Sequence, residues 1–185
     1  INWLLRGQRT MISANMLKIN RNIAQTFSRG VHIEARISQL GYKLPQEPPA
    51  PKGNYMGYTK RGNMIYLAGH LPQKADGSLV LGRLGENVSV EQGQEAARIA
   101  TLNMLATVRA ACGDLDKVTK IVKVTGFVNS TPDFVAQPSV LNGCSDMFGE
   151  IFGIDIGRHA RAALGVNTLP LGVAVEIEAI IEVSD

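Results

Sequence analysis

The sequence predicts an α+β domain with the element order βββαβαββ, in which one mixed sheet carries two helices on one of its faces. Three observations support this prediction. Within residues 158–182, apolar side chains recur at every second position in two stretches, and this period of two is typical of strands. Residues 118–128 form an apolar, β-branched run of the kind found in interior strands. Between the early strands and this run, Ser89 and Gln92 form a Ser-x-x-Gln capping box that marks the start of a long helix.

Three short strands are predicted to open the domain. Residues 55–59 and 64–68 are expected to form a hairpin, because a Gly-Asn pair lies in the turn between them. An Asp-Gly turn then leads into a third short strand near residues 79–81. The pattern thus places three strands ahead of the first long helix.

Two long helices are predicted. The first extends from Ser89 to about Ala111, because Gly113 is placed as a C-terminal stop. The second lies within residues 134–152, with Pro138 near its start. Two helices cover only one face of a sheet, so the other face needs a partner and we expect a homo-oligomer.

The last two strands, residues 160–166 and 173–181, are predicted to pair as an antiparallel hairpin. In a register centred on the Leu-Pro turn, Arg161 lies opposite Glu178 and diagonal to Glu176, within reach of long side chains. An arginine fork can bind a substrate carboxylate, and Glu176 can accept a proton from water as a general base. The alternative interpretation is a structural ion pair, or two charges that simply face water.

The chain begins with a basic leader, residues 1–33, that contains no acidic side chain. Its apolar residues recur at steps of three and four, with basic residues opposite, which predicts an amphipathic helix. These apolar positions are Met16, Ile19, Ile23 and Phe27. Such a leader resembles a mitochondrial transit peptide, so the expected location is the mitochondrial matrix or the cytoplasm. An unstructured tail or an untranslated leader is the alternative.

Residues 34–52 are expected to connect this leader to the rest of the chain. A short helix is predicted for residues 34–40, ended by Gly41. Residues 44–51 are rich in proline, which fixes φ and cannot continue a helix, so this part is expected to be extended. The main domain is therefore assigned to residues 53–185.

Composition and motif content exclude several function classes. The chain has 185 residues and is 45% hydrophobic, which suits one globular domain, and no apolar run approaches the roughly 20 residues that span a bilayer. The net charge is only +3 and its basic excess lies in the leader, so no nucleic-acid partner is expected. Cys112 and Cys144 show no metal or redox spacing, and phosphate-cradling and His-Glu-x-x-His motifs are missing. We expect no metal and no cofactor, and we interpret His70 and His159 as surface or hydrogen-bonded histidines.

A set of short motifs extends from about Glu34 to the C-terminus. It comprises Gly53-Asn-Tyr55, Gly62-Asn-Met-Ile65, Gly69-His-Leu-Pro72, Asp114-Leu-Asp-Lys-Val118, Asn142, Arg161 followed by Leu169-Pro170, and Val175-Glu-Ile-Glu-Ala-Ile180. The spacing from the arginine to Leu-Pro and on to Glu-Ile-Glu makes the set specific. It resembles the YjgF/RidA family, also called reactive intermediate deaminase or endoribonuclease L-PSP, in its longer RidA-like branch.

This resemblance implies a chorismate-mutase-like fold, a homotrimer, and sites in the clefts between subunits. It also implies hydrolysis of reactive, carboxylate-bearing enamines and imines to keto acids and ammonia, without a cofactor. Arg161 would hold the substrate carboxylate and Glu176 would activate the water. Tyr55, Gly69 and Asn142 would line the site, and the backbone carbonyl of Ala163 would hold a water.

The sequence also departs from the family pattern. Asn54 stands where proline is usual, Ala68 where serine is common, and Ala162-Ala163 where Ser-Cys often follows the arginine. A competing hypothesis is therefore a non-catalytic ligand-binding or chaperone-like trimer that keeps Arg161 as an anion anchor. Ribonuclease activity is disfavoured by the near-neutral charge of the domain and its few exposed-looking aromatic residues.

Overall fold

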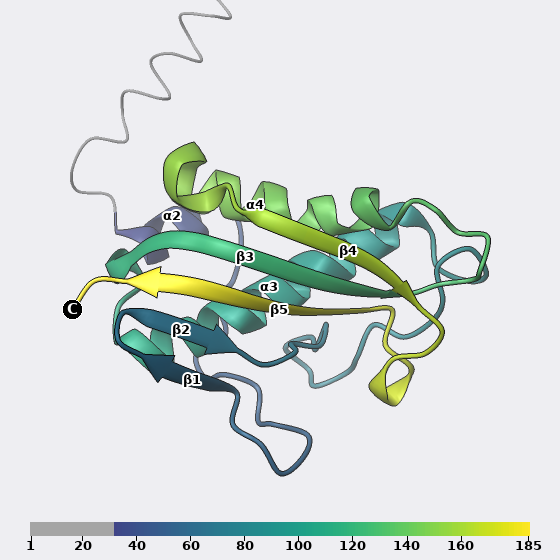
Figure 1. Ribbon diagram of the computed structural model, residues 1–185, viewed down its shortest axis with the longest axis horizontal. Coiled ribbons are helices and arrows are strands. Elements are labelled where there is room, and N and C mark those ends of the chain that lie inside the picture. Colours follow the sequence, from purple (N-terminus) through teal and green to yellow (C-terminus); the bar gives the residue numbers. More distant parts are fainter. Residues whose placement is uncertain (1–31) are drawn as a thin grey trace, which may run out of the picture. The chain divides into compact units, whose positions relative to one another are not determined.

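A five-stranded sheet organises residues 32–185, the part of the chain that this computed structural model describes (Figure 1). The strands are β1 (Tyr58–Arg61), β2 (Met64–Leu67), β3 (Val118–Asn129), β4 (Ala160–Val166) and β5 (Val175–Val183). They lie in the order β1-β2-β5-β3-β4. Neighbouring strands are antiparallel except β3 and β4, which run parallel. The predicted mixed sheet of an α+β domain is confirmed.

The early part of the sheet is simpler than predicted. The hairpin of β1 and β2 is present, with Arg61 opposite Met64 at its turn. The prediction of a third strand near residues 79–81 is wrong, because this segment forms only isolated β-bridges. Leu79 and Leu81 each meet a different part of the chain, so no continuous ladder of hydrogen bonds forms.

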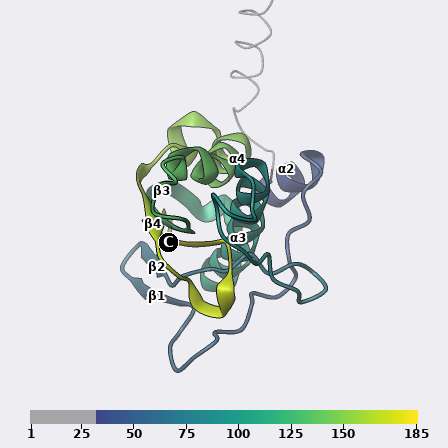
Figure 2. The same ribbon diagram turned by 90° about the vertical axis from the view of Figure 1, so that its right-hand side faces the viewer.

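Three α-helices are present in the described residues: α2 (Ile33–Gln39), α3 (Val90–Cys112) and α4 (Gln137–Gly157). Both long helices, α3 and α4, pack on the same face of the sheet (Figure 2). The three predicted helices are therefore found, and the second long one extends five residues past its predicted end at residue 152. The short helix α2 contacts α4.

Both ends of α3 follow the local signals in the sequence. The Ser89 hydroxyl accepts a hydrogen bond from the Gln92 backbone N–H at 3.2 Å, and the Gln92 side-chain oxygen accepts one from the Ser89 N–H at 2.8 Å. At the other end, Gly113 adopts a φ of 86°, which glycine tolerates at a helix terminus, and its N–H donates to the Arg109 carbonyl. The capping box and the glycine stop are confirmed.

Replacing Ser89 by alanine is expected to lower the free energy of unfolding by about 1 kcal/mol. The first turn of α3 would lose the acceptor for the Gln92 N–H. Ser89→Thr is the matched control, because it keeps a hydroxyl that can accept from the Gln92 N–H and donate to the Glu91 carboxylate, and it should stay within ~0.5 kcal/mol of the parent. Urea unfolding of the three proteins measures the difference, and equal losses in both variants would contradict a role for the cap.

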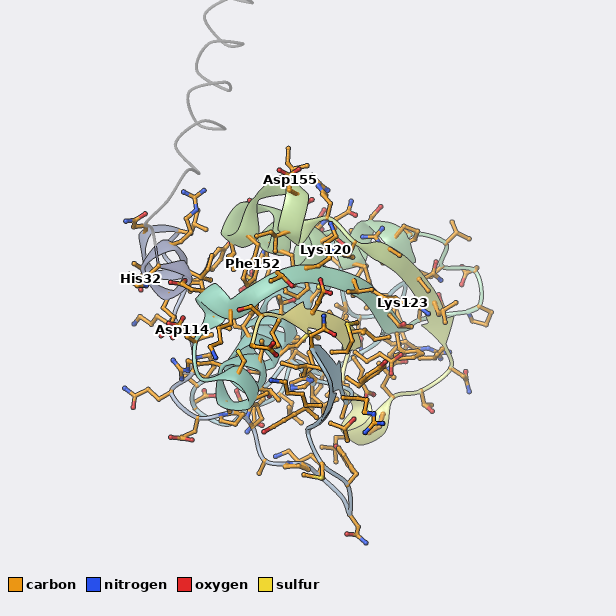
Figure 3. The ribbon with its side chains drawn as sticks, turned by 60° about the vertical axis from the view of Figure 1, so that its left-hand side comes forward. His32, Asp114, Lys120, Lys123, Phe152 and Asp155 are labelled. Carbon is orange, nitrogen blue, oxygen red and sulfur yellow. The ribbon has the colours of Figure 1, made fainter. Side chains whose placement is uncertain are left out.

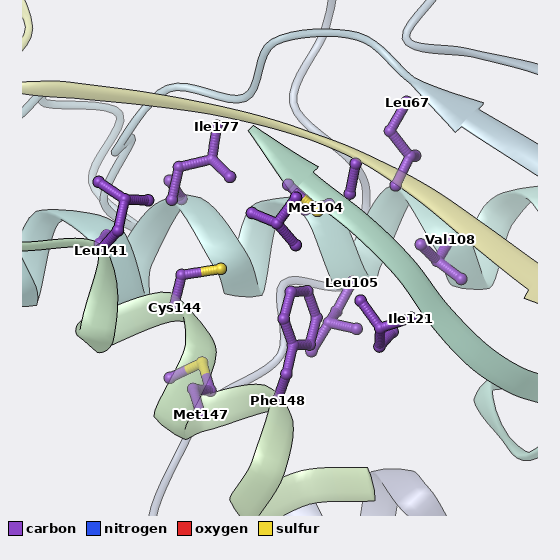
Figure 4. Close-up of a cluster of buried hydrophobic side chains, with 14 of the residues drawn as sticks. Leu67, Met104, Leu105, Val108, Ile121, Leu141, Cys144, Met147, Phe148 and Ile177 are labelled. Carbon is purple, nitrogen blue, oxygen red and sulfur yellow. The ribbon is translucent and has the colours of Figure 1, made fainter. Parts of the chain in front are cut away.

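The hydrophobic core lies between the sheet and the two long helices (Figure 4). Met104 and Leu105 of α3 and Phe148 of α4 are fully buried against strand residues such as Ile121 and Ile177. Burial of this apolar surface drives the helices onto one face of the sheet. The rigid layer that results fixes the positions of β3, β4 and β5, which carry the candidate site.

The predicted antiparallel hairpin of the last two strands is wrong. Strand β3 lies between β4 and β5, and it forms a parallel ladder with β4 and an antiparallel ladder with β5. The helix α4 provides the crossover that a parallel β3–β4 pair requires. Strand β5 is bonded on both edges, to β2 and to β3, so it has no free edge left for β4.

The sheet face away from α3 and α4, seen edge-on in Figure 2, carries exposed side chains, some of which are apolar. Tyr66 of β2 is 46% exposed and Leu164 of β4 is 48% exposed. Phe127 and Ile180, from the strands between them, are half-buried, and Glu178 is exposed. No described helix packs on this face, so the expectation that a partner covers it remains a prediction.

The amphipathic helix predicted within residues 1–33 falls outside the described residues. Residues 44–51 contain neither helix nor strand, as expected for a proline-rich connector. Within residues 32–185, no helix has the length and apolar character needed to cross a membrane.

Candidate active site

Arg161 and Glu176 lie on opposite faces of the sheet, which overturns their predicted meeting within one hairpin. Val124 of β3 pairs with Arg161 and is buried against the helices. Phe127, three residues further along β3, pairs with Glu176. Side chains alternate along a strand, so an odd separation places the two pairs on opposite faces. A single chain therefore carries two separate groups of candidate residues.

The first group, the arginine half-site, consists of Pro138, Asn142, Ser145, His159 and Arg161. The Arg161 Nη1 donates to the Asn142 side-chain oxygen and to the Ser145 hydroxyl, each at 3.0 Å, and its Nη2 donates to the Pro138 carbonyl at 3.2 Å. These acceptors all belong to the first turns of α4. Arg161 is thus held by neutral oxygens on the helix side of the edge strand.

Arg161 keeps free capacity to bind an anion. Among the described residues, no carboxylate lies within ion-pair distance of its guanidinium. Its Nε–H and one N–H of Nη2 have no acceptor in this part of the chain, and this pair of donors suits a bidentate carboxylate. The interpretation of Arg161 as half of a structural ion pair is therefore wrong.

The second group, the carboxylate half-site, consists of Tyr55, Gly69 and Glu176. Its main feature is the close approach of Gly69 to Glu176. The segment after β2 is bonded to β5, because the His70 N–H donates to the Ile177 carbonyl at 2.7 Å. This bond brings Gly69 so close to Glu176 that a Cβ at position 69 would lie 1.8 Å from the Glu176 Oε1. Only glycine leaves room for the carboxylate in this position.

Burial tunes the acidity of Glu176. Its side chain is half-buried, and this burial raises the pKa of its carboxyl above the usual value. The neighbouring carboxylate of Glu178 raises the pKa further. A raised pKa makes Glu176 a stronger base once it is ionised, as a general base requires.

A small hollow adjoins the carboxylate half-site. Tyr55 and Gly69 line it, and the proline-rich connector, residues 49–52, contributes a further wall. The Tyr55 ring is 51% exposed, and its hydroxyl accepts a weak hydrogen bond from the Lys52 N–H at 3.4 Å. The connector was predicted only as a boundary, and its proline content gave no sign that it lines a site.

His70 and His159 are hydrogen-bonded, as predicted. His70 is 5% exposed, and its ring contacts the Ala68 carbonyl at 2.7 Å and the Thr107 hydroxyl at 2.8 Å. Burial lowers the pKa of both histidines below the usual value. His70 therefore supports the fold under the hollow, whereas His159 belongs to the arginine half-site.

The structure groups the predicted site residues in two sets. Arg161 contacts Asn142, and Ala163 follows on the same edge strand. Gly69 contacts Glu176, and Tyr55 lines the same hollow as Gly69. Nothing in residues 32–185 of a single chain brings the first set to the second.

Sequence reasoning missed Ser145 as a contact of Arg161. One signal was present, because Asn142 and Ser145 are three residues apart and share a helix face. His159 is expected from the sequence to be a surface or hydrogen-bonded histidine, but its link to Arg161 through Ser145 is not. That link depends on where α4 crosses the sheet, which the pattern does not reveal.

Neither a metal nor a reactive thiol is indicated at these half-sites. His32, Asp114 and Asp116 lie close enough together to hold a cation, but they are exposed and lie beside α2, with His32 and Asp114 shown in Figure 3. Asp116 already accepts from the Ile33 N–H at 2.6 Å. Complete burial raises the pKa of Cys144 to about 12, so this thiol stays protonated.

Comparison with known proteins places the chain in a family. The family model described as YjgF/chorismate mutase-like endoribonuclease matches residues 34–182. Protein TCP17 from Trypanosoma cruzi is 42% identical over 153 residues, which cover 83% of this chain and 95% of that protein. The 2-iminobutanoate/2-iminopropanoate deaminase of Dermatophagoides farinae is 31% identical over 133 residues, covering 72% and 88%.

A solved structure agrees with the sequence comparisons. The crystal structure of the protein Atu1372 from Agrobacterium tumefaciens has a TM-score of 0.74 and 42% sequence identity, and the match covers 82% of this chain and 91% of that one. The five-stranded mixed sheet with its long helices on one face is thus the chorismate-mutase-like fold. The chain belongs to the YjgF/RidA family.

Proposed function

We propose that the protein hydrolyses reactive imines and enamines of small carboxylic acids to keto acids and ammonia. The observation that carries this proposal is the division of the site. A guanidinium with free donors lies on one face of the sheet, with no carboxylate of residues 32–185 within ion-pair distance. A half-buried carboxylate with a raised pKa lies on the other face. A relative that is 31% identical is named 2-iminobutanoate/2-iminopropanoate deaminase, which supports the same chemistry here.

The two half-sites are proposed to meet between subunits of a homotrimer. Each half-site is open to a partner: Arg161 lies on the edge strand β4, and Glu176 lies on the sheet face that no described helix covers. Arg161 of one protomer would then face Glu176, Gly69 and Tyr55 of the next. Contacts between two different surfaces close into a ring when the rotation permits.

Each residue has a role in the proposed reaction. The free Nε–H and Nη2–H of Arg161 bind the substrate carboxylate, and Tyr55 covers the substrate from the neighbouring protomer. Glu176 accepts a proton from a water whose oxygen attacks the imine carbon. The backbone carbonyl of Ala163 is proposed to orient this water. Glu176 then passes this proton to the imine nitrogen, which gives a carbinolamine. It next takes the proton of the carbinolamine hydroxyl and transfers it to the nitrogen, so that the C–N bond breaks as the C=O bond forms, ammonia leaves, and a keto acid remains. An enamine first takes a proton on carbon and loses one from nitrogen to become the imine.

The decisive experiment measures ammonia and keto-acid release from freshly generated 2-aminoacrylate. Arg161→Ala and Glu176→Gln are each expected to lower kcat/KM by about 100-fold or more in the folded protein. An inactive parent that still binds pyruvate through Arg161 would contradict the enzyme proposal and favour the non-catalytic binding trimer.

Mixing the two inactive variants tests the shared site. If each site takes Arg161 from one protomer and Glu176 from another, randomly re-assembled equal mixtures should regain about one quarter of the parental activity. This fraction follows because half of the protomers supply an intact arginine and half an intact glutamate. Mixtures that stay inactive after verified subunit exchange would place both residues in one protomer's site and contradict the trimeric arrangement.

The activity is expected to fall at low pH as Glu176 becomes protonated. Because Glu178 raises the pKa of Glu176, Glu178→Gln should lower that pKa and move the acidic limb of kcat/KM to lower pH. Glu182→Gln is the control, because Glu182 lies on the same face of β5 but bonds to Asn63 and Thr119 instead. A limb that does not move in Glu178→Gln, or moves equally in both variants, would contradict the assignment of Glu176 as the base.

A further inference from the structure

A chain of hydrogen bonds leads away from Arg161 into the protein. The Arg161 Nη1 lies 3.0 Å from the Ser145 hydroxyl oxygen, which lies 3.0 Å from the His159 Nε2. The His159 Nδ1 lies 2.7 Å from the Gly157 carbonyl oxygen. Four groups from β4, α4 and the segment between them are thereby connected in series.

The carbonyl at the end of the chain fixes the direction of every bond. A carbonyl oxygen only accepts, so the hydrogen of the neutral His159 ring must lie on Nδ1. The Nε2 then accepts the Ser145 hydroxyl hydrogen, and the Ser145 oxygen keeps its lone pairs for the Arg161 N–H. Arg161 thus donates to Ser145, Ser145 donates to His159, and His159 donates to Gly157. With Asn142 and Pro138, Ser145 thus supplies one of three acceptors that together favour one orientation of the Arg161 guanidinium.

We propose that Ser145 and His159 are a positioning pair that holds the Arg161 guanidinium in the orientation that binds a substrate carboxylate. The inference rests on the proposed function and deepens it, because it assigns the selectivity for carboxylates to residues that do not touch the substrate. Residues of α4 accept both N–H groups of Nη1 and one N–H of Nη2. The edge of the guanidinium formed by Nε and Nη2 is therefore left to bind the substrate carboxylate.

The surroundings of His159 keep its ring neutral, as this direction of bonding needs. Arg161, Arg158 and Lys120 are the charged groups that act on it, and all three are cationic. Burial is the main cause that lowers the pKa of His159, and these cations lower it further. The Phe148 ring packs edge-on against the imidazole, with ring centroids 5.7 Å apart, and so limits its rotation.

The same pair resembles a serine nucleophile with its base, but its surroundings argue against that role. Ser145 is 7% exposed, and its oxygen is enclosed between Arg161 and His159. One of the two lone pairs of this oxygen already receives the Arg161 N–H, which lowers its nucleophilicity. A positioning role needs only the two hydrogen bonds that the Ser145 hydroxyl already makes, to Arg161 and to His159.

The test measures binding by calorimetry on the full chain, with pyruvate as a carboxylate probe and pyruvamide as its uncharged analogue. Ser145→Ala and His159→Phe are expected to weaken pyruvate binding about tenfold and to leave pyruvamide binding unchanged. Ser145→Thr and His159→Gln restore the hydroxyl and the acceptor, and they should bind pyruvate within about threefold of the parent. Arg161→Ala should remove the preference for pyruvate altogether.

Thr101→Val is the matched control for the loss of a buried hydroxyl. Thr101 is fully buried in α3, and its hydroxyl donates to the Ala97 carbonyl and not to Arg161, Ser145 or His159. It should keep the parental preference for pyruvate. Parental pyruvate binding in folded Ser145→Ala, or equal loss for pyruvate and pyruvamide, would overturn the positioning role.

Binding and turnover separate the two proposals. If no imine is hydrolysed but Ser145→Ala still loses selective pyruvate binding, the positioning pair stands and the deaminase proposal fails. If the parent is an active deaminase and Ser145→Ala binds pyruvate as the parent does, the positioning pair fails and the function stands.

Discussion

Replacing Gly143 by alanine is expected to lower the free energy of unfolding by about 3 kcal/mol. Gly143 lies where α4 packs against α3, and an added Cβ would lie 2.2 Å from the Gln94 carbonyl oxygen and 2.9 Å from its Cα. These are backbone atoms of α3, so the clash can be relieved only by moving the two helices apart. Helix propensity alone predicts the opposite sign, a gain of about 1 kcal/mol for alanine.

The matched control lies in the same helix. Gly149→Ala places a Cβ no closer than 3.8 Å to the Arg158 side chain, which is an ordinary contact. It should therefore be as stable as the parent or more stable by up to about 1 kcal/mol. Urea unfolding of the parent and both variants measures the difference. Similar stabilities for the two variants would show that α3 and α4 do not approach each other as closely as described.

The elements of the fold could be predicted because each is encoded by a local signal. The capping box of Ser89 and Gln92 and the stop at Gly113 define α3, and the two-residue alternation defines β5. The pairing of β4 could not be predicted in this way. Alternation shows that residues 160–166 form a strand, but the choice of β3 as partner depends on the path of α4 over the sheet.

The same limit applies to the candidate site. A hairpin places Arg161 and Glu176 on one face, whereas pairing of both strands with β3 places them on opposite faces. The family resemblance implies these residues and a site between subunits, but it gives no contacts for Ser145. The neutral environment of Arg161, made of oxygens from α4, follows from three-dimensional packing and is not visible in the sequence.

Replacing Gly69 by alanine is expected to lower kcat/KM for imine hydrolysis by about 100-fold or more while the protein stays folded. The added Cβ would lie 1.8 Å from the Glu176 Oε1, so the carboxylate must rotate away from its present position. The fold should tolerate this change, because the displaced atoms are the free end of a flexible side chain.

Gly57→Ala is the matched control, because Gly57 lines the same hollow and its Cβ would lie 3.8 Å from the Thr107 Cγ2, an ordinary contact. It should keep kcat/KM within about threefold of the parent, since Glu176 does not move. Steady-state ammonia release and thermal unfolding of both variants provide the measurement.

Equal losses of activity in the two variants would show that the hollow is sensitive to any added methyl group. Parental activity in Gly69→Ala, beside an inactive Glu176→Gln, would show that Glu176 acts from a different position. A loss of activity in Gly69→Ala but not in Gly57→Ala would show that catalysis requires the Glu176 carboxylate in its present position, because the added methyl group displaces the carboxylate from that position.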